Sequence, residues 1–401
     1  MPTDRLYYGD SYLTEFTARV VSARQVDGGS EVVLDRTAFY PEGGGQPTDL
    51  GSIAGLSVVA VLERDEEVVH KLQGQLEAGQ EVTGKVLWDR RFDHMQQHSG
   101  QHILSQAFEQ LLEARTVSFH MGAEISNIDI AIPSLSQEDA NRVEDLANRV
   151  VFEGRPLRVH MLEEADLFRF NLRKGTDRTE DIRVVEVPGF DVIPCGGTHV
   201  RSTAEIGMIK MVRWERRSGN VRVEFLCGWR ALLDYRTKNR SVVELAAALS
   251  VRDREVPEAV ERLQREGDEL RHQIGQLRNR LQDYQAADLS RQAESVGSAL
   301  VVATKLDEAT PDDLKHLALR ITEEPGRVAL LATEGEKTQL VFARSEDITV
   351  DVGVLLRQVC APFGGRGGGK PNLAQGGIPE PGRATLVLQG AVEALRSLLA
   401  V

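Results

Sequence analysis

Two pairs of metal-binding residue types, far apart in the sequence, place the strongest constraint on how this chain folds. His98 and His102 are four positions apart, and Cys195 and His199 repeat that spacing about ninety residues later. On a helix, the first pair places both imidazoles on one face, a turn apart. The two glycines after the cysteine let the backbone fold tightly enough for the second pair to converge. Any fold for this chain is therefore expected to bring these two segments together.

Together, the two pairs offer three imidazole nitrogens and one thiolate sulfur, a donor set that suits zinc. We predict one Zn²⁺ per chain, bound by His98, His102, Cys195 and His199. Four protein ligands are typical of a closed structural site, whereas a catalytic site keeps one position open, and the sequence leaves both alternatives standing. His94 continues the four-residue spacing, but it lies where the helix begins, so we assign it no ligand role.

Composition is that of a globular protein of two or three domains. Of the 401 residues, 41% are hydrophobic and 27% are charged. No apolar run approaches the ~20 residues that span a bilayer, and no apolar stretch follows the N-terminus as in a secretory signal. Three widely spaced cysteines do not make a disulfide framework, so we expect a cytoplasmic protein without a membrane partner. The net charge of −13 still permits a local basic face.

Periodicity predicts an α+β fold in four parts. Residues 1–90 alternate with period two around a glycine-rich loop, which favours a small N-terminal β-barrel. Residues 91–250 form an α+β domain that carries the metal pairs. Within it we expect helices near 92–112 and 137–153 and strands near 182–187, 208–216 and 221–225. Residues 296–401 alternate strand-like and helix-like segments and form a C-terminal α/β domain.

Residues 251–295 form a long helical segment with a coiled-coil pattern. Its apolar positions alternate in steps of four and three, interrupted at Gly267: Val256, Val260, Leu263, Leu270, Ile274, Leu277, Leu281 and Tyr284. Such a seam packs equally well on its own chain or against a second chain, because heptads alone do not define the partner.

Several motifs of the first 250 residues carry a resemblance to one family. Residues 98–102 and 195–199 resemble the paired zinc motifs of the editing domain that alanyl- and threonyl-tRNA synthetases share. Residues 40–46, followed by Asp49, resemble the glycine-rich stretch of the alanyl branch, and residues 221–228 are similar to the strand that closes the editing domain.

The C-terminal part extends this resemblance over nearly the whole chain. Residues 367–377 resemble the C-terminal domain of alanyl-tRNA synthetase, which is related to the domain associated with DHH phosphoesterases. A synthetase carries its aminoacylation domain ahead of the barrel, whereas this sequence begins almost directly at the barrel, so we expect no such domain. The chain therefore resembles the freestanding alanyl-tRNA editing proteins, in the long form that keeps the C-terminal domain.

The resemblance implies a trans-editing hydrolase that cleaves the aminoacyl ester of mischarged Ser-tRNA(Ala), with Gly-tRNA(Ala) as a further substrate. An apolar pocket rejects an added hydroxyl poorly, so a second site that hydrogen-bonds this hydroxyl can separate serine from alanine. The zinc either activates water or anchors the amino acid and the terminal ribose. Gln46 is the candidate for orienting water or substrate, and Thr116 or Ser118 for reading the serine hydroxyl. For both hydroxyls, a bond to the local backbone is an equal alternative.

Three basic stretches are candidates for RNA contacts. The predicted contact residues are Arg213, Arg216 and Arg217, around an expected hairpin, and Arg366 and Lys370, which flank glycines that permit close approach of a phosphodiester. A further basic stretch covers residues 169–178. A solvated charged face is the alternative for each residue. The resemblance implies that the C-terminal half binds the tRNA elbow and can form a homodimer.

Three alternatives compete with this function. A phosphoesterase of the DHH type is disfavoured because the sequence has no Asp-His-His motif. An editing enzyme of the threonyl branch is disfavoured by the glycine-rich loop at residues 43–46. A non-catalytic tRNA-binding protein with a structural zinc stays open, and deacylation with and without a chelator separates it from the enzyme.

Overall fold

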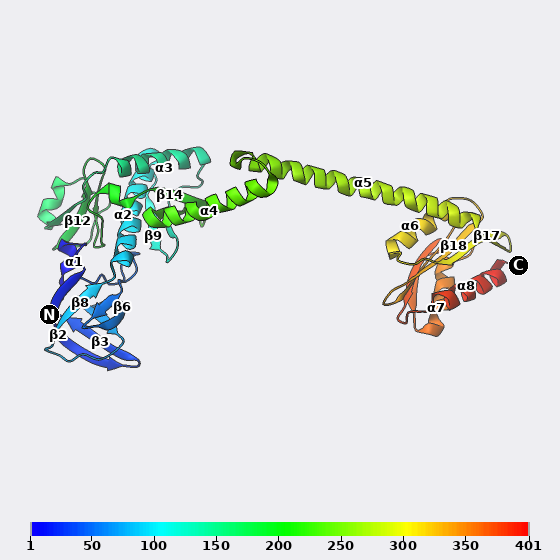
Figure 1. Cartoon of the computed structure of the whole chain (residues 1–401), viewed down its shortest axis with the longest axis horizontal. Helices are drawn as coiled ribbons and strands as arrows, with labels where there is room; N and C mark the ends of the chain where they lie inside the picture. The colour runs from blue at the N-terminus through cyan, green and yellow to red at the C-terminus, as the bar shows by residue number, and fades with distance from the viewer. Residues whose placement is uncertain (1, 400–401) are drawn as a thin grey trace. The chain divides into compact units, whose positions relative to one another are not determined.

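The chain divides into two compact units in the computed structural model, which describes residues 2–399 (Figure 1). Unit 1 comprises residues 1–248 and unit 2 comprises residues 249–401. The finer domain boundaries expected near residues 90 and 295 stay predictions. Across the described residues, helices fall short of the combined length and apolarity that a membrane crossing requires.

Six strands of unit 1 close into a barrel, as expected for residues 1–90. They are β2 (Glu15–Val26), β3 (Gly29–Leu34), β5 (Gly51–Ile53), β6 (Leu56–Arg64), β7 (Glu67–Leu72) and β8 (Glu81–Val86). Their order around the barrel is β2-β3-β7-β6-β5-β8, and β8 pairs with β2 to close it. On β2, Phe16, Ala18 and Val20 are buried while the residues between them are exposed, which is the period-two pattern of a barrel wall.

A short segment precedes the barrel and returns to it. Strand β1 (Asp4–Arg5) pairs in parallel with β4 (Arg36–Thr37), and α1 (Leu6–Gly9) follows β1. Tyr7 of α1 is buried against the ring of Tyr40, so this turn packs on the loop that follows β4.

The rest of unit 1 builds two sheets around the long helix α2 (Trp88–Leu112). The four-stranded sheet has the order β14-β15-β10-β9: β14 (Ile209–Arg217), β15 (Asn220–Cys227), β10 (Ser126–Ile130) and β9 (Thr116–Met121). The three-stranded sheet is β11 (Arg158–Leu162), β12 (Ile182–Val187) and β13 (Asp191–Pro194). Helices α3 (Gln137–Phe152) and α4 (Gly228–Leu249) complete the unit.

Helix α2 is central because residues 94–105 are all buried. Its apolar stripe, including Ile103, Leu104 and Phe108, joins the main core of unit 1 with α3 and the four-stranded sheet. The helix ends where Glu113 adopts a left-handed conformation at φ 52°. Helix α3 begins at Ser136, whose hydroxyl accepts from the backbone N–H of Asp139.

Unit 2 places helices on both faces of one sheet. The strand order is β16-β17-β18-β19-β21-β20: β16 (Glu294–Val296), β17 (Ala299–Lys305), β18 (Arg327–Glu334), β19 (Thr338–Arg344), β21 (Leu373–Ile378) and β20 (Arg366–Lys370). Alternate residues of β18 separate the two faces. Leu330 packs with α7 (Val352–Cys360) and α8 (Ala384–Leu399), whereas Leu331 packs with α6 (Pro311–Ile321).

The glycine-rich stretch of unit 2 forms a hairpin, β20 and β21, at the edge of this sheet. A side chain on Gly367 or Gly369 would meet Gln375 or Leu373 of the partner strand, at 3.0 Å and 2.3 Å respectively. The hairpin itself therefore requires glycine at position 369, whereas at Gly367 the nearest atom is Cδ2 of Leu356 on α7, at 2.9 Å. At Gly368, by contrast, a Cβ atom would meet nothing within 4 Å.

The heptad pattern of residues 251–295 lies on α5 (Val256–Arg291), a helix of 36 residues. Near its C-terminal end, Ala286 is buried in the core of unit 2. Most of the apolar seam is exposed within the chain, with Leu270, Ile274 and Leu277 at 58%, 60% and 62%. No second helix covers these positions in unit 2 among the described residues.

Candidate metal centre

Four side chains from two distant segments meet in unit 1. The ligand atoms of His98, His102, Cys195 and His199 all lie within 4.8 Å of one another. The Cys195 sulfur is 3.4 Å from His98 Nε2 and 3.3 Å from His199 Nε2. The sequence prediction that these two segments converge is confirmed, and the cluster can hold a metal ion. His94, one turn earlier on α2, is not part of it.

The glycines of the second segment serve close packing rather than a special backbone conformation. Neither Gly196 nor Gly197 has a positive φ. A Cβ atom on Gly197 would lie 2.2 Å from Cε1 of His98, so only glycine lets the loop approach the imidazole. On Gly196 the nearest atom would be the Tyr8 hydroxyl oxygen at 3.3 Å. The tight turn predicted from the sequence for both glycines is not supported by the structure. Gly197 is needed for steric reasons, and Gly196 is not.

Two of the three imidazoles, those of His98 and His199, have a hydrogen-bond partner for their second nitrogen, and His102 has only a carboxylate nearby. His98 Nδ1 is 2.7 Å from Gln46 Oε1, His199 Nδ1 is 3.2 Å from Ser99 Oγ, and His102 Nδ1 is 4.0 Å from Asp191 Oδ2. An amide oxygen only accepts, so Nδ1 of His98 is the donor and Nε2 is left unprotonated toward the cluster. Such partners fix the tautomer and ring orientation of metal-binding histidines.

Gln46 contacts His98 and does not line the cavity that opens beside the cluster. Its side chain is 1% exposed, its Nε2 donates to Thr198 Oγ1 at 2.9 Å, and its Oε1 also faces the backbone N–H of Thr198. Both polar ends of Gln46 are therefore engaged by protein groups. The glycine-rich loop thereby connects the barrel to both metal-binding segments.

Burial sets the protonation of the cluster. Desolvation lowers the pKa of His98 to about 3 and holds the pKa values of His102 and His199 well below their usual value. These imidazoles are consequently neutral at physiological pH, as metal ligands must be. Burial also raises the pKa of the Cys195 thiol, while the nearby Arg183 guanidinium opposes that change. Arg183 holds this loop by donating to the carbonyls of Cys195 and Gly197 at 2.7 and 2.9 Å.

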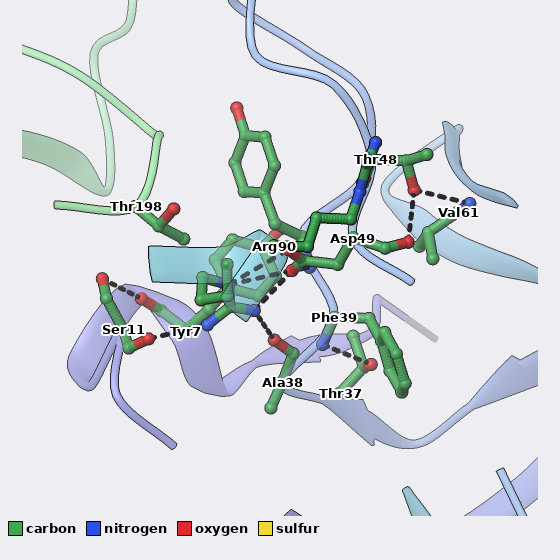
Figure 2. Close-up of polar contacts among 12 residues, drawn as sticks. Tyr7, Ser11, Thr37, Ala38, Phe39, Thr48, Asp49, Val61, Arg90 and Thr198 are labelled. Carbon is green, nitrogen blue, oxygen red and sulfur yellow. Dashed lines mark hydrogen bonds and ion pairs between the residues drawn. The ribbon is translucent and has the colours of Figure 1, made fainter. Parts of the chain in front are cut away.

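A buried ion pair fastens the start of α2 to the barrel. Arg91 and Asp49 are both 0% exposed, and Arg91 Nε donates to Asp49 Oδ2 at 3.0 Å. Arg91 also donates to the carbonyls of Ser11 and Ala38, and Asp49 accepts from the backbone N–H of Tyr40. Figure 2 shows these contacts as dashed lines, with Ser11, Ala38 and Asp49 labelled. The Arg91–Asp49 pair therefore sets the position of the glycine-rich loop relative to α2.

A cavity of about 580 Å³ opens beside the cluster. Its lining includes three of the four cluster residues and both predicted hydroxyl residues: His98, His102, Cys195, Thr116 and Ser118. Thr116 Oγ1 lies 2.6 Å from Ser105 Oγ, which also accepts from Gln101 Nε2 at 2.7 Å. The Ser118 hydroxyl donates to Asp129 Oδ2 at 2.7 Å. Both predicted hydroxyls are therefore hydrogen-bonded to side chains and not to the local backbone.

The predicted RNA contacts occupy other surfaces. Arg213, Arg216 and Arg217 lie on β14, the opposite edge of the sheet from β9, which lines the cavity. Arg213 pairs with Glu224 at 2.8 Å. Arg366 and Lys370 stand at the two ends of β20 in unit 2. Their roles stay predictions.

Sequence reasoning singled out Gln46 for another role and did not identify the other residues around the cluster. The partners Ser99, Asp191 and Arg91 act through contacts between distant segments, which no local pattern announces. A usable signal was present only for Ser99 and Gln101, which lie between the two histidines of α2.

Three family models match parts of this chain. Residues 182–224 match the threonyl and alanyl tRNA synthetase second additional domain, residues 298–400 the DHHA1 domain, and residues 10–90 the family of class II (A) tRNA synthetases. Over 99% of this chain and 100% of the relative, the sequence is 33% identical to the alanyl-tRNA editing protein AlaX-L of Pyrococcus horikoshii. The chain belongs to this family of alanyl-tRNA editing proteins.

Alanine–tRNA ligases share the same region. The chain is 36% identical to the ligase of Methanoregula boonei over 96% of its own length and 43% of the ligase. It is 31% identical to the ligase of Pyrococcus abyssi over 98% of its own length and 44% of that protein. The similarity thus covers less than half of each ligase.

Proposed function

We propose that this chain is a trans-editing hydrolase that deacylates mischarged Ser-tRNA(Ala), with Gly-tRNA(Ala) as a second substrate, at a zinc-holding site. The cavity beside the cluster carries the proposal, because His98, His102 and Cys195 line it. A structural zinc site is closed, whereas a site that acts on a substrate needs an open side. The free cysteines suit a reducing compartment such as the cytoplasm.

The donor set and its spacing support zinc. A tetrahedral zinc with Zn–S of about 2.3 Å and Zn–N of about 2.0 Å separates sulfur and nitrogen by about 3.5 Å. The Cys195 sulfur lies 3.4 and 3.3 Å from the nearest nitrogens of His98 and His199. Zinc supplies Lewis-acid chemistry when bound. The chain's own contribution is to hold the imidazoles neutral and oriented, for which we assign Gln46 a positioning role toward His98.

We assign the reading of the serine hydroxyl to Thr116. The Thr116 hydroxyl donates to Ser105 Oγ, which is buried and also accepts from Gln101, so Thr116 Oγ1 keeps its lone pairs for a donor in the cavity. The hydroxyl of a serine ester supplies that donor. An alanine ester has no such donor and loses this hydrogen bond, at a cost of about 1–3 kcal/mol.

Matched variants test this assignment. Thr116→Val keeps the shape and removes the hydroxyl, so kcat/KM for Ser-tRNA(Ala) should fall about 10- to 100-fold while that for Gly-tRNA(Ala) stays unchanged. Ser118→Ala is the comparison, because the Ser118 hydroxyl is engaged by Asp129. An equal loss for both substrates in Thr116→Val, or a serine-selective loss in Ser118→Ala, would assign the hydroxyl contact elsewhere.

The deacylase itself is tested by zinc removal. The zinc-loaded protein should hydrolyse Ser-tRNA(Ala), and Cys195→Ala or treatment with a chelator should abolish the hydrolysis. Binding of tRNA without hydrolysis, unaffected by the chelator, would instead support a non-catalytic tRNA-binding protein with a structural zinc.

We also assign a second copy of this chain to the seam of α5. Leu270, Ile274 and Leu277 are more than half exposed, and apolar heptad positions of this kind are normally covered by a partner helix. Ile274→Glu places a charge in the seam and should shift the protein from dimer to monomer in sedimentation equilibrium. A wild-type protein that sediments as a monomer would remove the proposal.

A further inference from the structure

The loop between β11 and β12 carries charges of both signs, but only its cations face the cavity. Arg173, Lys174 and Arg178 are cavity-lining residues. The six carboxylates of the same loop are absent from the described lining: Glu163, Glu164, Asp166, Asp177, Glu180 and Asp181. The loop is therefore arranged with its positive side toward the metal cluster.

The root of this loop is held beside the candidate metal centre. Arg173 donates to both carboxylate oxygens of Asp191 at 2.8 and 3.0 Å, and its backbone N–H donates to the Val192 carbonyl at 2.8 Å. Asp191 is buried and lies 4.0 Å from His102 Nδ1. Arg173 thus serves as an anchor whose charge is already neutralised, and it holds the next residue, Lys174, beside the cavity.

Lys174 and Arg178 keep their charges free. Both are exposed, and neither forms an ion pair with any described residue. The single carboxylate among the described lining residues, Glu63, is paired with Arg5 at 2.6 Å. Two uncompensated cations therefore stand at the mouth of the cavity, in a chain whose net charge is −13.

We propose that Lys174 and Arg178 bind the phosphodiesters of the single-stranded 3′ end of the RNA substrate, next to the ester that enters the cavity. This inference rests on the proposed function for the identity of the substrate. It places the RNA contact nearest to the cluster on this loop, and not on the β14 edge that bears Arg216 and Arg217. Lysine and arginine contacts to phosphate position a strand without reading its sequence.

Salt dependence provides the test, because each phosphate contact to a single strand contributes about 0.7 to the slope of log affinity against log salt. The probe is uncharged tRNA(Ala), bound by the full-length, zinc-loaded chain. The Lys174→Ala, Arg178→Ala double variant should lower the magnitude of this slope by about 1.4. The ratio of wild-type affinity to variant affinity should therefore fall by about sevenfold when the salt concentration rises fourfold. Its KM for Ser-tRNA(Ala) should rise at low salt, with kcat unchanged.

The control removes two exposed cations from the same unit, Arg236 and Arg240 of α4, which are outside the cavity lining. The Arg236→Ala, Arg240→Ala variant should keep the wild-type slope. A slope equal to wild type in the Lys174 and Arg178 variant, or an equal decrease in the control, would overturn the inference. Because binding is measured without turnover, a chain that binds tRNA with the predicted slope but does not deacylate it would contradict only the proposed function.

Discussion

The two glycines between Cys195 and His199 are equivalent in sequence, but the structure separates them sharply. A Cβ atom on Gly197 would lie 2.2 Å from Cε1 and 2.5 Å from Nδ1 of His98, where ordinary contacts are 3.4–4 Å. The His98 ring must therefore move by at least about 1 Å. That ring is also held by Gln46 at 2.7 Å, so the movement breaks its hydrogen bond as well.

Gly197→Ala should accordingly impair metal binding far more than Gly196→Ala. Overpacking costs about 1–3 kcal/mol. Loss of a residue that hydrogen-bonds a metal-binding histidine, as Gln46 does here, lowers metal affinity by about 10- to 100-fold. We therefore expect Gly197→Ala to lower zinc affinity by at least about 10- to 100-fold. Gly196→Ala meets only the end of the Tyr8 side chain, at 3.3 Å, and should stay within about twofold of wild type.

Zinc content per chain, measured after equilibration with chelators of graded affinity, distinguishes the two variants. Circular dichroism of both variants checks that each is folded. Equal zinc affinities for Gly197→Ala and wild type would refute the steric argument, as would a Gly196→Ala variant that loses zinc to the same degree.

Three further predictions follow from buried groups and from the hairpin. Asp49→Asn leaves Arg91 as an uncompensated buried charge and should lower the free energy of unfolding by about 3–5 kcal/mol in urea denaturation; a loss below about 1 kcal/mol would mean that the pair is dispensable. Burial lowers the pKa of His70 to about 4, so only the unfolded chain takes up this proton as pH falls from about 6.5 to about 4. Stability should therefore be complete above that range and decrease by about 3 kcal/mol within it, and this decrease should be missing in His70→Asn. Gly368→Ala adds a methyl group in open space, so it should leave the melting temperature unchanged and weaken tRNA binding if a phosphodiester approaches β20, whereas Gly369→Ala should unfold the hairpin.

Much of the fold follows from local pattern. The period-two alternation on β2 was predictable because this strand has one buried face. Strand β12 and helix α2 were also expected near their observed bounds, although β12 is buried on both faces and residues 94–105 of α2 are all buried. Residues 366–378 were not predictable as strands, because glycine has low strand propensity and here the reason is tertiary. Gly369 is needed where the two hairpin strands approach each other, and Gly367 where the hairpin also packs against Leu356 of α7.

The candidate site was also predictable only in part. The cluster was predictable because three histidines and one cysteine in two matched spacings are an uncommon pattern, and the structure confirms that these four residues meet. The contacts that support the cluster were not predictable. Gln46 is 52 positions from His98, and Arg91 is 42 positions from Asp49, so only the folded chain brings each pair together.

Hydrolysis of Ser-tRNA(Ala) by the purified full-length chain tests the central claim most directly. The zinc-loaded protein is expected to release serine from Ser-tRNA(Ala) and to leave Ala-tRNA(Ala) intact, and Cys195→Ala is expected to be inactive under the same conditions. Release of serine at the wild-type rate by metal-free Cys195→Ala, or equal release of alanine by the wild type, would contradict the account.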